Sequence, residues 1–391
     1  MNMEKLLRGQ NRKNMQFRDL KKQYQILKKD IDQAIVSVLN EGNYILGKQV
    51  EELEESLAEY VGVKHCITCG NGTDALTMAL MTLDIKEGDA IFVPNFTFFA
   101  TAEAVSFSGA TPIFVDVDEE TFNLDPKKLE IVIKNVLSER RFIPKAIIAV
   151  DLFGLPADYV NIKKVADRYN LKIIEDGAQG FGGSINGKRA CSFGDISTTS
   201  FFPAKPLGCY GDGGAIFTDN DAYAEYLKSI QVHGKNGADK YDNVRIGMNS
   251  RLDTLQAAIL QVKLKAFIDY ELEAVNKVAS WYDQRLREIV DVPTIPEGFY
   301  SSWAQYTIKL KSKKQRDELQ AKLKDTEIPT MIYYPKTMSE QTAYKDLDVK
   351  NANLSISEKL SKTVLSLPMH PYFMGEEIEI VCAKIKKCDL T

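Results

Sequence analysis

The stretch SFFPAKPLGCYGDGGA, residues 200–215, is the most informative part of this 391-residue chain. It places Lys205 between Pro203 and Pro206, after an aromatic pair and before a cluster of glycines. The two prolines restrict the backbone on both sides of the lysine. A solvated surface lysine needs no such frame, because its flexible stem and hydrated ammonium group suit any exposed face. The restricted setting therefore indicates an amine that must reach one particular atom.

Around this stretch, apolar runs alternate with helical patterns. The runs HCITC, AIFVP, PIFVDV, AIIAV and KIIED are typical of buried strands. An amphipathic helix over residues 20–38 is expected to end at Gly42, and the helices predicted between the strands cover residues 73–83, 98–107, 126–136 and 158–169. Repeated strand–helix–strand units predict an α/β fold with a mainly parallel central sheet, covered by helices on both faces.

Length and pattern together predict two domains. The chain exceeds the size at which single hydrophobic cores usually stop growing. The alternating pattern predicts a large domain over residues 15–265. A long helix over residues 251–290, the strand WAQYTIKLK, a polar helix over 313–323 and a final amphipathic helix around Ile378 predict a smaller α+β domain over 266–391. Residues 1–14 are polar, basic and aperiodic, and are expected to form a disordered N-terminal extension.

Composition argues against several classes of protein. The net charge of -4 does not provide the clustered excess of Lys and Arg that nucleic-acid binding requires. No apolar run approaches the roughly 18 residues of a membrane span, and no secretion signal opens the chain. A cytoplasmic protein without nucleic-acid or membrane partners is expected. Cys66 and Cys69 form a C-x-x-C pair without a matching second pair, so buried thiols are expected and no metal site.

The segment HCITCGNGTDALTMAL predicts a strand, a glycine turn and the start of a helix. Gly70 and Gly72 let the backbone approach a ligand, and free amides at a helix N-terminus bind phosphate. The structural alternative is that Thr73 only caps the helix.

KIIED ends with Asp176, and the strand over residues 198–202 leads to Lys205. Ligands of open α/β sheets bind at the carboxyl ends of strands, so both side chains are well placed for a site. Asp176 could instead form an ion pair with Arg or Lys. An amine, an acid and a phosphate site are the groups that an aldehyde-bearing pyridine cofactor needs, which predicts pyridoxal phosphate. Phe98 could stack on the ring, or could be an ordinary core residue.

An NAD-dependent enzyme is the rival hypothesis. Gly70, Gly72 and Ala75 satisfy G-x-G-x-x-A, and Asp89 follows about 20 residues later. However, the ribose-binding acid should follow the second strand, whereas Asp89 precedes it.

The motifs NGTDAL, FTFFATAEAV, IIEDGAQ, SFFPAKPLGCYGDGGA, NSRLDTLQAAIL and LSLPMHP together resemble the DegT-type nucleotide-sugar aminotransferases, a branch of the fold-type-I pyridoxal phosphate enzymes. The resemblance extends from about Phe17 to beyond His370. It implies a PLP fold-type-I aminotransferase fold and a homodimer with shared active sites. It also implies transfer of the amino group from L-glutamate, which leaves as 2-oxoglutarate, to a keto-sugar nucleotide.

The resemblance further implies roles for individual residues. Lys205 would bind the cofactor covalently and then move the proton between cofactor and substrate. Asp176 would keep the ring nitrogen protonated. The other implied cofactor contacts are Gln179 at the ring oxygen, Phe98 on the ring face, Gly72, Thr73 and Ser200 at the phosphate, and Asn249 from the neighbouring subunit.

The motif SFFPAKPLGCYGDGG is most similar to the corresponding motif of enzymes that aminate carbon 3 of UDP-2-acetamido-3-oxo sugars, including the 3-oxo-glucuronate, in O-antigen synthesis. By this likeness, substrate contacts are expected at Gly42, Tyr44, Arg251, Tyr333 and Tyr334. The sequence departs from the family at two positions: Ala204 replaces the usual Ser or Gly, and Tyr333 replaces the usual His.

Other functions remain open at this point. Family members that use a dTDP-3-oxo-6-deoxy or a 4-oxo sugar nucleotide are the nearest alternatives. A non-enzymatic ligand-binding protein could share the fold. A sugar dehydratase of the same lineage would lack the lysine, and this chain keeps Lys205.

Overall fold

The computed structural model describes residues 15–235, 241–347 and 353–388. The predicted N-terminal extension, residues 1–14, lies outside the described residues.

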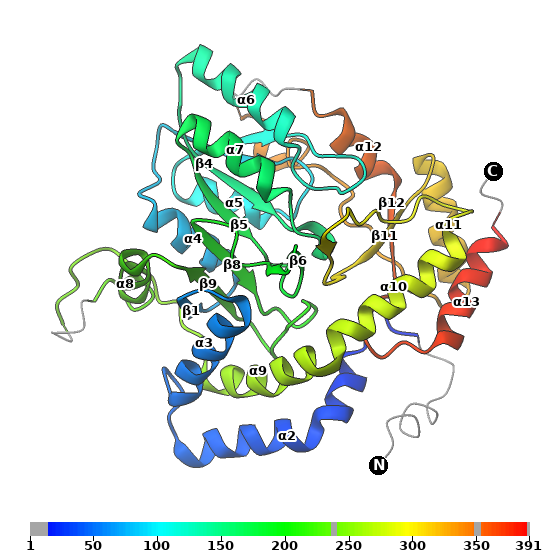
Figure 1. Ribbon diagram of the computed structural model, residues 1–391, viewed down its shortest axis with the longest axis horizontal. Coiled ribbons are helices and arrows are strands. Elements are labelled where there is room, and N and C mark those ends of the chain that lie inside the picture. Colours follow the sequence, from blue (N-terminus) through cyan, green and yellow to red (C-terminus); the bar gives the residue numbers. More distant parts are fainter. Residues whose placement is uncertain (1–14, 236–240, 348–352, 389–391) are drawn as a thin grey trace.

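A seven-stranded sheet forms the centre of the larger part of the molecule (Figure 1). Its strands follow the order β1-β9-β8-β5-β4-β2-β3. They are β1 (His65–Cys69), β9 (Gly214–Thr218), β8 (Ile196–Ser200), β5 (Lys172–Asp176), β4 (Ile143–Val150), β2 (Asp89–Pro94) and β3 (Thr111–Val115). Strand β9 is antiparallel to both of its neighbours, and the other adjacent pairs are parallel. The sheet is therefore mainly parallel, as predicted.

Side chains of the sheet alternate between two helical layers. The helices are α4 (Gly72–Thr82), α5 (Ala100–Phe107) and α8 (Asp221–Ile230) on one face, and α6 (Pro126–Glu139) and α7 (Tyr159–Tyr169) on the other. Within β2, Ile91 and Val93 pack into the first layer, while Ala90 and Phe92 pack into the second. Helix α3 (Lys48–Val61) covers the antiparallel edge beside β1. Both faces are buried, which explains the nearly continuous apolar strands.

A long helical segment leads from the larger part to the smaller one (Figure 1). Helix α9 (Thr254–Ala266), the π-helical turn η2 (Phe267–Glu271) and α10 (Leu272–Leu286) follow one another directly. The predicted long helix is therefore confirmed. The domain boundary predicted at 265/266 falls inside this segment and stays a prediction.

The smaller part has its own core. Strands β11 (Tyr306–Lys309) and β12 (Val364–Leu367) pair antiparallel, and helices α11 (Lys313–Asp325), α12 (Ser355–Thr363) and α13 (Gly375–Lys386) lie around them. Ile378, Val381 and Ile385 of α13 are fully buried, as their spacing predicts. Short strands β6 (Ser184–Ile185), β7 (Lys188–Arg189) and β10 (Phe299–Tyr300) form a three-stranded sheet, whose β10 comes from the segment after α10.

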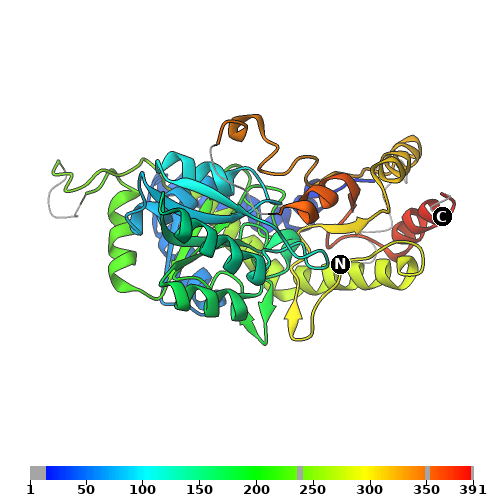
Figure 2. The same cartoon turned by 90° about the horizontal axis from the view of Figure 1, so that it is seen from above.

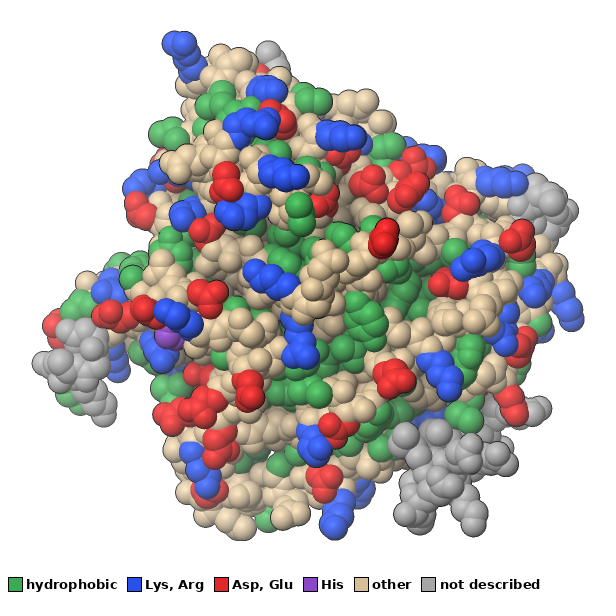
Figure 3. Space-filling view, in the orientation of Figure 1, with side chains coloured by type: hydrophobic (Ala, Val, Ile, Leu, Met, Phe, Trp, Pro, Cys, Tyr) green, Lys and Arg blue, Asp and Glu red, His purple; other side chains and the backbone are tan. Residues whose placement is uncertain are grey.

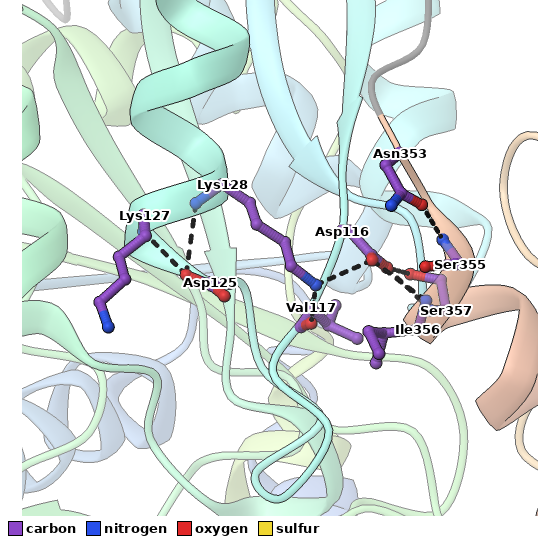
Figure 4. A network of polar contacts seen from close by, with 9 residues as sticks. All are labelled: Asp116, Val117, Asp125, Lys127, Lys128, Asn353, Ser355, Ile356 and Ser357. Atoms are coloured by element: carbon purple, nitrogen blue, oxygen red, sulfur yellow. Dashed lines mark hydrogen bonds and ion pairs between the residues drawn. The ribbon is translucent and has the colours of Figure 1, made fainter.

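Asp116 ties the two parts together (Figure 4). It follows β3 and is 1% exposed, and it accepts hydrogen bonds from Lys128 Nζ at 2.9 Å, from Ser357 Oγ at 2.5 Å and from the amide of Ser357 at 2.8 Å. Burial alone would raise the pKa of this carboxyl, but the hydrogen bonds from Ser357 and Lys128 hold the pKa below its ordinary value. The charged carboxylate thus fixes the start of α12 against the sheet.

Helix α2 (Leu20–Glu41) packs against α9 and ends at Gly42, whose φ of 69° is the left-handed conformation that glycine favours. The chain just before α2 reaches the smaller part, where the amide of Met369 donates to the carbonyl of Phe17 at 3.1 Å. The first described residues therefore bridge both parts.

The visible surface has no charged patch of one sign. On the face shown in Figure 3, Lys and Arg are interspersed with Asp and Glu. Within the described ranges, no helix combines the length and apolar character needed to span a bilayer.

Candidate active site

A cavity of about 500 Å³ opens at the carboxyl ends of the parallel strands. The strand ends bring together side chains that are far apart in the sequence, as expected for an open α/β sheet. The predicted residues that line the cavity are Gly72, Thr73, Phe98, Asp176, Gln179, Ser200, Lys205, Tyr333 and Tyr334. Asn71, Thr97, Ala204, Asp212 and Gln305 also line it.

The start of α4 forms one wall of the cavity. Asn71 is the N-cap, and its side chain accepts a hydrogen bond from the amide of Asp74 at 2.8 Å. The alternative that Thr73 caps the helix is therefore wrong, because Thr73 already lies in the first turn. A Cβ at Gly72 would lie 2.7 Å from Ser200 Cβ, so only glycine permits this close approach.

Asp176 occupies the floor of the cavity at the end of β5. It is 5% exposed, and its carboxylate accepts from Thr101 Oγ1 at 2.9 Å and from the amide of Ala178 at 3.3 Å. Burial raises the pKa of Asp176, while the bond from Thr101 and the charge of Lys205 act in the opposite direction. No ion-pair partner contacts this carboxylate among the described residues. The predicted alternative of a direct structural ion pair is therefore not observed.

Lys205 lies in the same cavity, on the turn that follows β8. The amide of Lys205 donates to the carbonyl of Phe202 at 2.8 Å, which closes the turn between the two prolines. Burial lowers the pKa of the amine, Asp176 raises it and Arg18 lowers it. The amine has no hydrogen-bonding partner within the described part of the chain, so it is available to a ligand.

Gln179 and two aromatic side chains complete the walls. Gln179 accepts from the amide of Phe153 at 2.8 Å and donates to Tyr334 OH at 3.0 Å. Phe98 is 53% exposed, and its ring lies 6.1 Å from that of Tyr334 at an interplanar angle of 42°. Phe98 is thus a cavity residue with a free face, and the alternative that it is an ordinary core residue is wrong.

The residues present fit pyridoxal phosphate. For the amides of Gly72 and Thr73, no acceptor is found in the described ranges, and Ser200 adds a hydroxyl beside them. Such free amides at a helix N-terminus suit a phosphate. A buried acid and an unpartnered amine face the same space, and the volume is adequate for a small cofactor.

Four of the predicted residues do not line this cavity within one chain: Gly42, Tyr44, Asn249 and Arg251. Tyr44 is 47% exposed, and its carbonyl accepts from the amide of Thr254 at 3.0 Å. Asn249 is exposed and forms an isolated bridge with Val232. Their expected roles at the site stay predictions.

The structure argues against the dinucleotide hypothesis. Asp89 begins β2 at the amino edge of the sheet, and its carboxylate accepts from the amide of Lys86 at 3.0 Å. It therefore lies at the opposite end of the strand from the cavity. Strand β1 also lies at the antiparallel edge, whereas the fingerprint requires a central parallel strand. Cys66 and Cys69 are buried in β1, as expected for structural thiols.

Sequence analysis missed three residues near the amine and the acid. Thr101 binds Asp176, and Asp212 lines the cavity from within the motif that contains Lys205. Arg18 donates to the carbonyl of Lys205 at 2.7 Å across 187 positions of sequence. No local pattern marks a contact of that range.

The model of the DegT/DnrJ/EryC1/StrS aminotransferase family matches residues 25–386 of the chain. UDP-2-acetamido-2-deoxy-3-oxo-D-glucuronate aminotransferase from Pseudomonas aeruginosa is 45% identical over 372 residues, which cover 95% of this chain and 99% of that protein.

Solved structures agree with this match. A DegT DnrJ EryC1 StrS aminotransferase from Brucella abortus is 49% identical and has a TM-score of 0.93, with 95% of this chain and 99% of that chain covered. NtdA from Bacillus subtilis, solved with the bound cofactor PMP, is 30% identical and has a TM-score of 0.85. The match covers 97% of this chain and 87% of that chain. The fold is that of the type-I pyridoxal phosphate aminotransferases, and the cofactor is pyridoxal phosphate.

Proposed function

This chain belongs to the DegT/DnrJ/EryC1/StrS aminotransferase family, and we propose that it transfers the amino group of L-glutamate to carbon 3 of a UDP-2-acetamido-2-deoxy-3-oxo-hexose or -hexuronate. The observation that supports this proposal best is that Lys205 and Asp176, from two separate strand ends, line one cavity beside the start of α4. The product would serve the synthesis of a bacterial surface polysaccharide such as O-antigen.

When bound, pyridoxal phosphate supplies an electron-poor ring that stabilises negative charge on a carbon that loses a proton. In the proposed arrangement, Gly72, Thr73 and Ser200 hold the phosphate. Asp176 holds a proton on the ring nitrogen, and its low exposure keeps water from competing for that contact.

Lys205 is the proposed base and acid. Burial lowers the pKa of its amine, which increases the uncharged fraction that can accept a proton. The Lys205 turn would hold Nζ close to the carbon that exchanges a proton, so the amine would act at an effective concentration that no free amine reaches. This role would explain why prolines restrict the backbone on both sides of Lys205.

Tyr333 and Tyr334 contribute neutral hydroxyl groups to the lining of the cavity. Lys205 is the only cation among the lining residues of the described chain. A carboxylate on carbon 6 would therefore need a cation from a second subunit, and Arg251 is the proposed candidate. A neutral hexose needs no such partner.

The proposal includes a homodimer with shared sites. Tyr241 and Ile246 are 84% and 86% exposed in the segment after α8, which extends from the body in both views (Figures 1 and 2). Val36 and Leu39 expose apolar surface on α2. Burial of these side chains against a second subunit would remove apolar surface from water. Asn249 follows the extended segment and is proposed to reach the partner's cofactor.

The proposal is tested by incubating the enzyme with L-glutamate and UDP- or dTDP-linked 3-oxo and 4-oxo sugars, followed by mass analysis. Amination of a UDP-3-oxo sugar is expected. Turnover of only a 4-oxo or a dTDP-linked sugar would overturn the substrate assignment.

The covalent role of Lys205 is tested by borohydride reduction of the yellow enzyme and peptide mapping. The label is expected on Lys205 and not on Lys263, a second buried lysine that lies outside the cavity lining. Lack of colour after reconstitution with pyridoxal phosphate would contradict the assignment.

A further inference from the structure

The main chain of the Lys205 turn is held by an arginine from the start of the described chain. Arg18 Nη2 donates to the carbonyl of Lys205 at 2.7 Å and lies 3.4 Å from that of Pro206. No other donor to the Lys205 carbonyl is found among the described residues. Arg18 thus supplies this half-buried carbonyl with a contact that the turn itself does not make.

The turn is closely packed at Gly208. A Cβ at Gly208 would lie 2.5 Å from the carbonyl oxygen of Pro203 and 2.6 Å from that of Phe202. The turn therefore folds back on itself, and among the described residues Arg18 is the only donor to the carbonyls of Lys205 and Pro206.

Arg18 is itself held in place. The ring of Phe17 lies 6.2 Å from that of Tyr333, a residue that lines the cavity. Asp19 caps α2 by accepting from the amide of Lys22 at 2.8 Å. The residues on both sides of Arg18 are thus anchored, and its guanidinium lies against the Lys205 turn.

The charges around Arg18 are partly balanced. The acid Glu271 is 3% exposed and accepts from Gln23 at 2.9 Å and from the hydroxyl of Tyr372. Burial lowers the pKa of Arg18 to about 10, while the charges of Glu271, Tyr372 and Tyr333 raise it. Arg18 is therefore cationic at neutral pH. The other groups that face it are Lys263 and His370.

Lys205 faces charges of both signs. Asp176 from β5 raises the pKa of the amine, whereas burial and the Arg18 guanidinium lower it. Asp212, Tyr333 and Tyr334 are the remaining titratable groups that line the cavity. Among the described residues, Arg18 is the only cation whose charge lowers the pKa of this amine.

We propose that Arg18 is a positioning residue, which fixes the main chain of the Lys205 turn and sets a cationic guanidinium behind its amine. This inference rests on the proposed role of Lys205. It means that Arg18, near the beginning of the described chain, influences the reactivity of Lys205, which lies 187 positions later in the sequence.

The test compares R18M, R18K and K22M, each as the full-length chain. Lys22 is a matched control because its Nζ donates to the carbonyl of Tyr372 at 2.9 Å, so K22M also removes one cation and one bond to main chain. Acetic anhydride labels the cofactor-free proteins across a pH series, and mass spectrometry gives the rate at Lys205. The pH midpoint of visible absorbance of the cofactor-loaded proteins is a second measurement.

In R18M we expect the labelling midpoint of Lys205 and the absorbance midpoint to move to higher pH, with labelling at neutral pH several-fold slower. R18K keeps the charge and should keep midpoints closer to wild type, and K22M should match wild type. Unchanged midpoints in R18M would overturn the inference, as would equal shifts in K22M. If R18M does not fold, R18K provides the test. We then expect Lys205 in R18K to be labelled more slowly than in wild type, with the pH midpoint unchanged. Labelling at the wild-type rate would overturn the inference.

Failure of this inference is distinguishable from failure of the proposed function. In the first case, wild-type enzyme still transaminates a sugar nucleotide while R18M shows unchanged labelling. In the second, wild-type enzyme does not transaminate.

Discussion

Glu175 and Asp176 are neighbours at the end of β5, both are buried, and they point to opposite faces of the sheet. Glu175 is 0% exposed and accepts from the amides of Cys191 at 2.5 Å and Phe193 at 2.7 Å, and from Ser197 Oγ at 2.7 Å. Asp176 faces the cavity and has two neutral donors. The strand's alternation separates a structural acid from one that is available to a ligand.

The comparison teaches that burial alone does not identify a catalytic acid. Burial raises the pKa of both carboxyls. The two carboxylates differ in their hydrogen-bonding partners. Donors of the protein occupy both oxygens of Glu175, whereas Asp176 can still accept hydrogen bonds on the side of the Lys205 amine and the cavity. A cofactor with a cationic ring nitrogen can use that capacity.

The largest expected effect is that of D176N on turnover. Loss of the carboxylate removes preorganised charge from the ring nitrogen, and we expect kcat to fall on the order of 10²–10³-fold. The free energy of unfolding should change much less than for a substitution of Glu175. Stopped-flow half-reactions with L-glutamate measure the effect. D212N is the matched control, since Asp212 is another acid of the same cavity. Turnover of D176N near the wild-type rate would contradict the assignment.

The reverse pattern is expected for E175Q. The NH2 that replaces one carboxylate oxygen cannot accept a hydrogen bond, so at least one donor among Cys191, Phe193 and Ser197 loses its partner. An unsatisfied buried donor costs about 1–3 kcal/mol of stability. Urea unfolding should show this loss, while kcat per folded molecule stays close to wild type. A selective loss of kcat without destabilisation would remove the distinction between the two acids.

A smaller effect is expected for T101V, which removes the hydroxyl that donates to Asp176. That bond lowers the pKa of Asp176 against the effect of burial, so its loss raises the pKa further. Cofactor affinity falls when Asp176 becomes protonated, and in T101V this fall should begin at higher pH. We expect about 0.5–1.5 kcal/mol weaker binding. Equilibrium dialysis of pyridoxal phosphate across pH measures it, and T101S should restore the wild-type profile.

Much of the site could be predicted because the topology of the sheet determines which residues come together. Parallel strands place their carboxyl ends at one edge, so Gly72, Asp176 and Lys205 converge once each is assigned to a strand end. Local signals also fixed the end of α2 at Gly42. The cap of α4 could not be assigned in the same way. Asn71 and Thr73 are both good caps, and only the backbone conformation distinguishes them.

Contacts between distant segments left no such signal. Arg18 meets the Lys205 turn because α2 and α9 pack together, which depends on the whole fold. The apolar pattern identifies a buried face but not which polar group meets another across it. Asp151 and Glu175 are an example, because nothing in DLFG or IIEDG indicates that the two acids face each other.

The smallest effect is expected for D151N. This substitution tests the comparison of Glu175 with Asp176 through a neighbour of Glu175. Asp151 Oδ1 accepts from the amide of Ala157 at 3.0 Å and from Tyr159 OH at 2.8 Å, while Oδ2 is buried without a donor among the described residues. Burial and the neighbouring charge of Glu175 raise the pKa of Asp151 well above its ordinary value. Since Glu175 already has three donors, Asp151 holds the proton of the pair.

A proton held in the folded state and not in the unfolded state makes stability fall as pH rises. For wild type, the fall should begin near the unfolded-state pKa of about 3.9 and continue toward the raised folded-state pKa. An amide at position 151 mimics the protonated acid, so D151N should lie within about 0.5 kcal/mol of wild type in weakly acidic solution and depend less on pH above it. Urea unfolding at several pH values measures both slopes. Strong destabilisation of D151N at every pH would mean that Asp151 is ionised, and Glu175 would then have to carry the proton despite its three donors.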